Sequence, residues 1–389
     1  MIALFAVLFA FEKIALVDSF DVIPCADTET KAGTEAIVDH VLETGATHVF
    51  WRNQSGSVVR YPSVEEDRRK LRAPLDKRRL GRDDPFGWAR LDRGADVDNL
   101  IAHVFADLKR KGIGTGIHFT FEESHCASAT LGQWNLEHPQ YWVRTKGGKP
   151  FYGRCSFAYD EVYEHKMRLV DELIAMGPET LCLDMYRNGG LSLAWEYTPK
   201  LEAEFRAAYG EEAPDDPTDE RWIRLVSKST ERYMRGVSER CRAAGVRFLV
   251  ELVKIPPAAK DDRFLWETYG FDWRKLAAAG LFDGLVVQSV DIVPSDVFGS
   301  VERAYRYVQA NRGTAKVFFH CSAYDYAKGI PTYAKLTGLS YGAVAHRLLE
   351  LARDCGGEGV VLECVDWQNY TEELNREIRG FMGKGNTER

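Results

Sequence analysis

The sequence lacks the short motifs that mark several large enzyme classes. No G-x-G-x-x-G or G-x-x-x-x-G-K-[ST] segment occurs, so we expect neither a dinucleotide nor a nucleoside triphosphate as ligand. The H-x-H pair typical of amidohydrolase barrels is missing from the first apolar run, where only Asp18 and Asp21 are acidic. Eight cysteines occur without a C-x-x-C pair or regular spacing, which excludes a zinc finger and argues against a disulfide framework.

An excess of positive charge and long hydrophobic runs are also absent. The net charge of −7 argues against a nucleic-acid partner. Residues 1–11 are apolar, but they are too short to span a bilayer and no basic residues precede them. We therefore expect no membrane partner, and the sequence leaves both a cytoplasmic and a periplasmic location open. Residues 1–11 are either a trimmed signal peptide or an extra segment beside the first strand.

Eight short runs of β-branched or aromatic residues recur along the chain, and nearly all the intervals between them have a helical pattern. The runs predict strands near 13–20, 47–52, 114–121, 180–185, 247–253, 284–290, 316–320 and 359–365. Eight strands alternating with helices indicate an α/β fold of the (β/α)8 TIM barrel type. We expect one catalytic barrel domain over 1–389, with long βα loops inserted near 53–94, 122–157 and 195–245. In the last of these, EEAPDDPTDE predicts a turn between two helices.

Each of these runs has a polar or charged residue at or near its carboxyl end. In a barrel, the carboxyl ends of the strands form the face at which enzymes of this fold carry out their chemistry. A charged group is more stable at that end than inside the apolar run, because burying an unpaired carboxylate is costly. The predicted ring consists of Asp18 or Asp21, Arg52, His118 or Glu122, Asp184, Glu251, Gln288 or Asp291, His320, and Glu363 or Asp366.

Asp184 and Glu251 are the most isolated carboxylates of this ring. Asp184 follows three apolar residues and precedes Tyr186, Arg187 and an Asn-Gly-Gly turn, whereas Glu251 lies within an apolar run. Adjacent strands lie about 5 Å apart, so two such side chains can bracket one glycosidic bond at the roughly 5–5.5 Å used in retaining hydrolysis. We expect Asp184 to be the nucleophile and Glu251 the acid/base. The alternative is a structural ion pair between Asp184 and Arg187.

The segment ETLCLDMYRNGG resembles the LD-x-x-R segment of glycoside hydrolase barrels, especially the family-10-like glycosyl hydrolases. An Asp on the fourth strand and a Glu on the fifth also resemble the alpha-amylase type of site. That resemblance implies a nucleophile at Asp184, an acid/base at Glu251 and a charge-stabilising Asp, which falls on Asp325. The chain departs from the type because Cys182 replaces an Arg, and Asp325 lies five residues beyond His320.

The other residues at the ends of the predicted strands combine flat aromatic faces with hydrogen-bonding groups, as the binding of a sugar requires. The residues expected to bind the sugar are Asp18, Trp51, Arg52, His118, Glu122, Tyr186, Arg187, Gln288, Asp291, His320, Tyr324, Asp325, Glu363, Asp366 and Trp367. Any one of them could instead form hydrogen bonds to the backbone of a loop or pack in the core. If the first pair is wrong, Glu363 and Asp366 are the next carboxylates to test.

Two other functions fit parts of the same ring. Glu251, Asp291, His320 and Glu363 follow the ligand order of xylose-isomerase-type barrels, so a metal-dependent sugar isomerase or epimerase is the alternative. For that site Asp291 must come from a loop, and the long insertions suit an extended glycan cleft better. A non-catalytic carbohydrate-binding barrel is the third possibility. We expect a glycoside hydrolase that acts on an oligo- or polysaccharide and needs neither a metal nor a cofactor.

Overall fold

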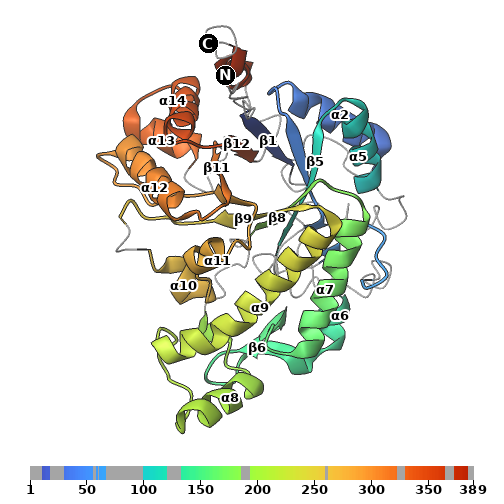
Figure 1. Ribbon diagram of the computed structural model, residues 1–389, viewed down its shortest axis with the longest axis vertical. Helices are drawn as coiled ribbons and strands as arrows, with labels where there is room; N and C mark the ends of the chain where they lie inside the picture. The colour runs from blue at the N-terminus through green and yellow to red at the C-terminus, as the bar shows by residue number, and fades with distance from the viewer. Residues whose placement is uncertain are drawn as a thin grey trace, which may run out of the picture.

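The structure is a computed structural model that describes residues 11–17, 30–55, 58–59, 61–66, 100–120, 133–184, 193–258, 262–321, 329–363 and 372–383. Eight parallel strands form a closed barrel in the order β1-β12-β11-β10-β9-β8-β5-β2 (Figure 1). They are β1 (Glu12–Val17), β2 (His48–Arg52), β5 (Gly114–Thr120), β8 (Thr180–Asp184), β9 (Arg247–Leu252), β10 (Gly284–Val287), β11 (Lys316–His320) and β12 (Gly359–Glu363). The predicted (β/α)8 barrel is confirmed, and each of the eight expected strands is present.

Helices surround this barrel and connect its strands (Figure 1). They are α2 (Lys31–Leu42), α5 (Leu100–Arg110), α7 (Asp160–Ala175), α9 (Glu220–Ala244), α10 (Phe264–Tyr269), α11 (Trp273–Ala278), α12 (Val297–Asn311), α13 (Ile330–Thr337), α14 (Tyr341–Asp354) and α15 (Glu372–Gly383). Gly245 ends α9 with a φ of 69°, a conformation that glycine adopts without strain, and the chain then enters β9 directly. In the part of the chain that is described, no helix has the length and apolar character needed to cross a membrane.

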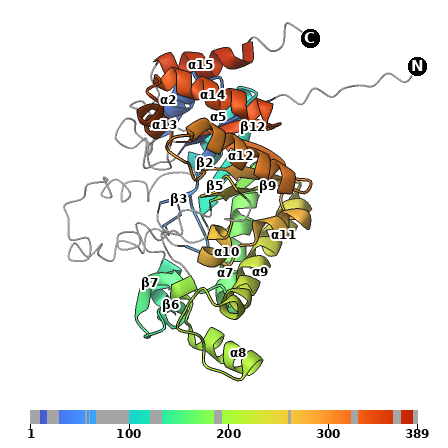
Figure 2. The ribbon, with the colours of Figure 1, turned by 90° about the vertical axis from the view of Figure 1, so that its left-hand side faces the viewer.

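The long connections hold additional elements. As predicted, the 195–245 insertion contains two helices, α8 (Pro199–Tyr209) and α9, on either side of the acidic turn. The expected 122–157 loop instead contains α6 (Gln133–Glu137) and a hairpin of β6 (Trp142–Arg144) and β7 (Pro150–Cys155). Strands β6 and β7 and helix α8 lie together at one end of the molecule (Figures 1 and 2). The shortest pair of strands, β3 (Gln54–Ser55) and β4 (Val58–Val59), follows β2.

Side-chain alternation along the strands creates two separate apolar layers. The interior of the barrel is filled by Ile14, Leu16, Phe50, Cys182, Leu249, Val286, Phe318 and Val361. The residues between them, such as Val49 and Leu183, pack in the larger layer between strands and helices. Because side chains repeat every two residues, the residue two positions after each inner one also points toward the barrel axis. The same alternation directs six polar residues at the carboxyl ends of the strands toward the barrel axis: Arg52, Asp184, Glu251, Gln288, His320 and Glu363.

A charged cluster closes the amino-terminal end of the barrel. Both oxygens of Glu12 accept hydrogen bonds from Arg247 at 3.0 Å, Lys316 Nζ lies 3.3 Å away, and His48 Nε2 lies 3.6 Å away. Burial by itself would raise the pKa of Glu12, but Arg247, His48 and Lys316 together bring it below its usual value. The cluster ties strands β1, β2, β9 and β11 together at the face opposite the polar ring.

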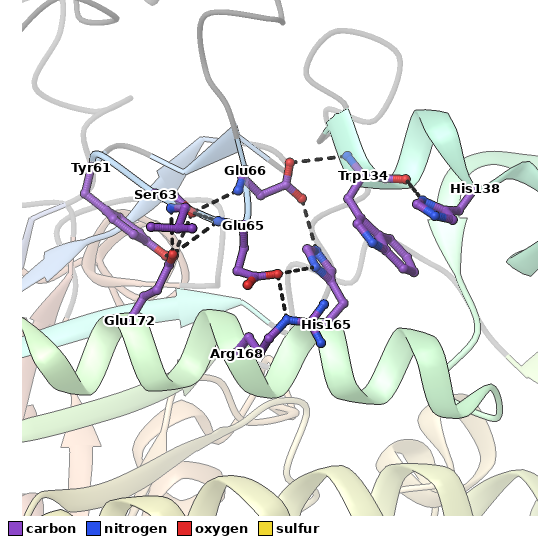
Figure 3. A network of polar contacts seen from close by, with 10 residues as sticks. Tyr61, Ser63, Glu65, Glu66, Trp134, His138, His165, Arg168 and Glu172 are labelled. Atoms are coloured by element: carbon purple, nitrogen blue, oxygen red, sulfur yellow. Dashed lines mark hydrogen bonds and ion pairs between the residues drawn. The ribbon is translucent and has the colours of Figure 1, made fainter.

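A second polar network attaches residues 61–66 to α7 (Figure 3). Glu172 on α7 accepts hydrogen bonds from the Tyr61 hydroxyl at 3.1 Å, the Ser63 hydroxyl at 2.6 Å and the Val64 amide at 2.7 Å. One carboxylate therefore holds three residues of an otherwise irregular segment. We refer to Glu65, Glu66, Trp134, His165 and Glu172 together as the α7 clasp.

His165 forms the centre of the α7 clasp. Its side chain is fully buried, with Nε2 3.2 Å from Oε1 of Glu66 and Nδ1 3.5 Å from Oε2 of Glu65. The ring of Trp134 stacks on it at a centroid distance of 4.3 Å and an interplanar angle of 5° (Figure 3). Glu66 also accepts a hydrogen bond from the Trp134 amide, at the start of α6. The α7 clasp thus joins the connections that follow β2 and β5.

Candidate active site

Three side chains from the adjacent strands β5, β8 and β9 meet at the carboxyl end of the barrel. His118, Asp184 and Glu251 each provide one nitrogen or oxygen atom, and these atoms lie within 4.8 Å of one another. Nε2 of His118 is 3.4 Å from Oε1 of Glu251 and 3.8 Å from Oδ2 of Asp184. The three side chains are at most 1% exposed. The sequence-predicted pair is therefore brought together, with His118 in contact with both carboxylates.

The electrostatic environment separates Glu251 from an ordinary surface carboxyl group. Burial raises its pKa, His118 opposes this effect, and the negative charges of Asp184 and Glu363 raise the pKa further. A carboxyl group whose pKa is raised keeps its proton to higher pH, as a general acid requires. Burial also raises the pKa of the Cys182 thiol, which lies inside the barrel below this pair, so the thiol remains neutral.

A second polar group comes from the ends of β10, β11 and β12. Nε2 of His320 lies 2.8 Å from Oε2 of Glu363, and the Gln288 amide donates a hydrogen bond to the other oxygen, Oε1, at 3.4 Å. These three side chains are between 4% and 8% exposed. The group combines hydrogen-bond donors and acceptors in one place, and such groups can bind a polar ligand. All three residues were expected from the sequence to bind the sugar.

Other expected ligands have different positions. Arg52 is fully buried at the end of β2, on the inner face with Phe50. Trp51 is on the opposite face, packed in the apolar layer between strands and helices and only 3% exposed. The expected contact between Trp51 and a sugar does not fit this position, because the ring faces away from the barrel interior.

Asp291 lies beyond the end of β10, where its amide donates a hydrogen bond to the Ile255 carbonyl at 2.9 Å. In the described ranges, Glu251 forms a group of possible metal ligands with His118 and Asp184, whereas His320 pairs with Glu363. The four isomerase-type ligands are therefore not gathered in one cluster. The remaining predicted residues lie outside the described part of the chain: Asp18, Glu122, Tyr186, Arg187, Tyr324, Asp325, Asp366 and Trp367.

The contact of His118 with both carboxylates is the feature that the sequence analysis missed. His118 was expected only as a sugar ligand. The signal was present in the run GTGIHFT, because alternation places His118 on the same face as Gly116, which packs against the Phe50 ring inside the barrel. His118 lies two residues before the end of β5 and is paired in register with Cys182, the inward-facing residue that precedes Asp184 on β8.

The sequence matches no protein-family model and no curated protein. The structure is similar to the glycoside hydrolase domain of PgaB (BpsB) from Bordetella bronchiseptica, with a TM-score of 0.60 and 13% identity over 96% of this chain and 99% of that one. It is also similar to a beta-galactosidase from Marinomonas ef1, with a TM-score of 0.55 and 11% identity over 96% and 59% of the two chains. A family GH20 exo beta-N-acetylglucosaminidase from Vibrio harveyi gives a TM-score of 0.51 and 10% identity over 96% and 54%.

The fold is a barrel that glycoside hydrolases use. At 10–13% identity these similarities establish the architecture and leave the chemistry to be argued from the site itself. They do not distinguish the family-10-like group, to which the segment around Asp184 bears a resemblance, from other glycoside hydrolase barrels.

Proposed function

We propose that this protein is a glycoside hydrolase that cleaves a glycosidic bond in an oligo- or polysaccharide, with Asp184 as nucleophile and Glu251 as acid/base. One observation carries the proposal: two buried carboxylates at the ends of adjacent barrel strands have oxygen atoms within 4.8 Å of each other. Retaining enzymes separate their carboxyl groups by about 5–5.5 Å and inverting enzymes by about 6.5–9.5 Å. The short separation favours retention of the anomeric configuration.

The mechanism requires two chemical steps. Asp184 attacks the anomeric carbon while Glu251 gives its proton to the departing glycosidic oxygen, so that an aspartyl ester of the sugar forms as the glycosidic bond breaks. Glu251, now a carboxylate, takes a proton from water, and the resulting hydroxide attacks the same carbon and releases Asp184. The raised pKa of Glu251 supports its role as the initial acid.

Sugar hydroxyls would bind to the opposite wall of the barrel mouth. Gln288, His320 and Glu363 supply amide, imidazole and carboxylate groups that are already held against one another. Arg52 adds a guanidinium group at the end of β2. A metal-dependent isomerase receives less support, because Glu251 lies with His118 and Asp184 rather than with His320 and Glu363.

The test is hydrolysis of a panel of aryl glycosides by wild type, Asp184→Ala and Glu251→Ala, with a chelator present throughout. Azide should restore turnover to both variants, giving a glycosyl azide of inverted configuration with Asp184→Ala and of retained configuration with Glu251→Ala. Asp171→Asn is a matched control, since Asp171 is a half-exposed carboxylate on α7 that pairs with Arg240. Near-normal turnover by either site variant would remove that residue from the pair.

A further inference from the structure

The buried carboxylates Asp184 and Glu251 have a third neighbour, His118, which takes no part in either of the proposed catalytic roles. Within the described part of the chain, neither nitrogen of His118 has a hydrogen-bond partner, and Oε2 of Glu251 has none either. Nε2 of His118 lies between the two carboxylates at distances longer than an ordinary hydrogen bond. Buried polar atoms in proteins are nearly always hydrogen-bonded, so an unsatisfied group of this kind indicates a ligand that the site is built to receive.

We propose that His118, Asp184 and Glu251 form a binding site for one divalent transition-metal ion of the Zn²⁺ class, and that the bound ion inhibits hydrolysis. One imidazole and two carboxylates are a donor set that suits Zn²⁺, Co²⁺ and Mn²⁺ better than Mg²⁺ or Ca²⁺, which prefer oxygen ligands alone. Zinc binds nitrogen and oxygen at about 2.0–2.2 Å, so donor atoms around it are roughly 3–4 Å apart. Three atoms within 4.8 Å reach that spacing through small side-chain rotations.

Charge also favours a cation at this position. Two carboxylates are held out of water beside the imidazole of His118, and the negative charge of Glu363 acts on Glu251 as well. A divalent ion would offset this repulsion. It would also occupy the oxygen lone pairs that attack the sugar and move the proton, so the metal-bound form cannot hydrolyse. Only this inhibitory effect rests on the proposed function, because binding of the ion depends on the three donors alone.

His320 provides a matched control for His118. It is also a buried histidine at the barrel mouth, but its Nε2 lies 2.8 Å from Glu363 and is not one of the three grouped donors. His118→Gln and His320→Gln therefore remove one imidazole each, from the proposed ligand set and from the neighbouring pair. Circular dichroism and thermal unfolding would establish that both variants fold.

The experiment is a titration of the chelator-treated, full-length protein with Co²⁺, followed by visible absorption, and with Zn²⁺, followed by calorimetry. We expect one equivalent to bind wild type and His320→Gln. Loss of even an outer-shell partner typically weakens metal binding by about 10–100-fold, so loss of the ligand in His118→Gln should weaken it at least as much. Asp184→Asn should have the same effect as His118→Gln, so a folding failure in one variant does not decide the result.

Two outcomes would overturn the site: no binding by wild type at micromolar metal, or equal affinity in wild type and His118→Gln. Activity then separates this inference from the proposed function. Hydrolysis in chelator without metal binding would support the hydrolase and refute the metal site. Stoichiometric Co²⁺ binding that depends on His118, without hydrolysis in either form, would support the site and refute the hydrolase. Stoichiometric inhibition by Zn²⁺ that is weakened in His118→Gln would support both.

Discussion

Nε2 of His320 lies 2.8 Å from Oε2 of Glu363, and the two side chains are buried at the ends of the neighbouring strands β11 and β12. Residues in such direct contact couple energetically, typically by about 0.5–3 kcal/mol. We therefore expect a double-mutant cycle of His320→Gln and Glu363→Gln, measured by urea unfolding, to give a coupling energy of about 1–3 kcal/mol. Additive effects would mean that the pair is not formed in solution.

Variants of the two carboxylates proposed to be catalytic should respond differently to the leaving group. Glu251→Gln removes the acid, so we expect a loss of roughly 10²–10⁴-fold in kcat/KM on alkyl glycosides, which need a proton, and a smaller loss on dinitrophenyl glycosides, which do not. Asp184→Asn removes the attacking oxygen and should impair both substrate classes equally. A plot of log kcat/KM against leaving-group pKa checks this, and identical slopes for the two variants would contradict the assignment.

Glu251 should also lower the stability of the folded protein at neutral pH. Its pKa is raised in the folded state, so folding favours the protonated form. The stability that the protonated group contributes at pH values below its usual pKa of 4.5 is lost as the pH rises through the raised pKa. Glu251→Gln avoids this cost. We expect the variant to have a higher Tm than wild type at pH 7, with the difference shrinking near pH 4, as measured by calorimetry. An unchanged or lower Tm at pH 7 would indicate that other interactions offset the cost of burying the Glu251 carboxylate.

Glu12 should show the opposite pH dependence. Its pKa is lowered in the folded protein, so its contribution is present above its usual value of 4.5 and is lost as the pH falls through the lowered pKa. We expect Glu12→Gln to cost about 1–3 kcal/mol at pH 7, because Arg247 loses a charged hydrogen-bond partner. Urea unfolding at pH 7 and near pH 3 checks this, and an equal cost at both values would exclude an electrostatic origin.

The α7 clasp should contribute to global stability. His165→Phe keeps the stacking on Trp134 but removes both contacts to Glu65 and Glu66, and leaves the buried Glu66 carboxylate with weaker partners. We expect a loss of about 1–3 kcal/mol in the free energy of unfolding. His103→Phe is the control, since His103 pairs with the half-exposed Glu35 and should change stability by less than about 1 kcal/mol. Equal effects of the two changes would argue against a special role for the clasp.

Much of the barrel could be predicted from the sequence because its signals are local. Asp184 and Glu251 each follow an apolar run, and alternation alone places them on the inner face with Cys182 and Leu249. The contact expected between Trp51 and a sugar does not fit its position, because Trp51 lies on the opposite face of β2 from Phe50 and packs between strands and helices. The hairpin of β6 and β7 was also missed, because β6 has only three residues and β7, with the sequence PFYGRC, shows no alternation of apolar and polar residues.

Contacts between segments that are far apart in the chain could not be predicted from the sequence. His118 approaches Glu251 only because β5, β8 and β9 are neighbours in a fixed register, a relationship that no single run encodes. The contact between His165 and Glu66 spans 99 residues of the chain and joins helix α7 to an irregular segment that follows β2. Such pairs are decided by tertiary packing, so they can be identified only after the fold is known.

The pairing of β1 with β12 has a consequence for how the chain acquires its structure during synthesis. β1 hydrogen-bonds to a strand that lies roughly 350 residues later, with Glu12 opposite Gly359. A ribosome adds about 5–20 residues per second, so one edge of β1 would wait about 20–70 s for its partner. Throughout that interval an unpaired apolar edge is open to wrong strands and to other chains. The nascent protein is therefore expected to depend on chaperone protection until the last strand has emerged.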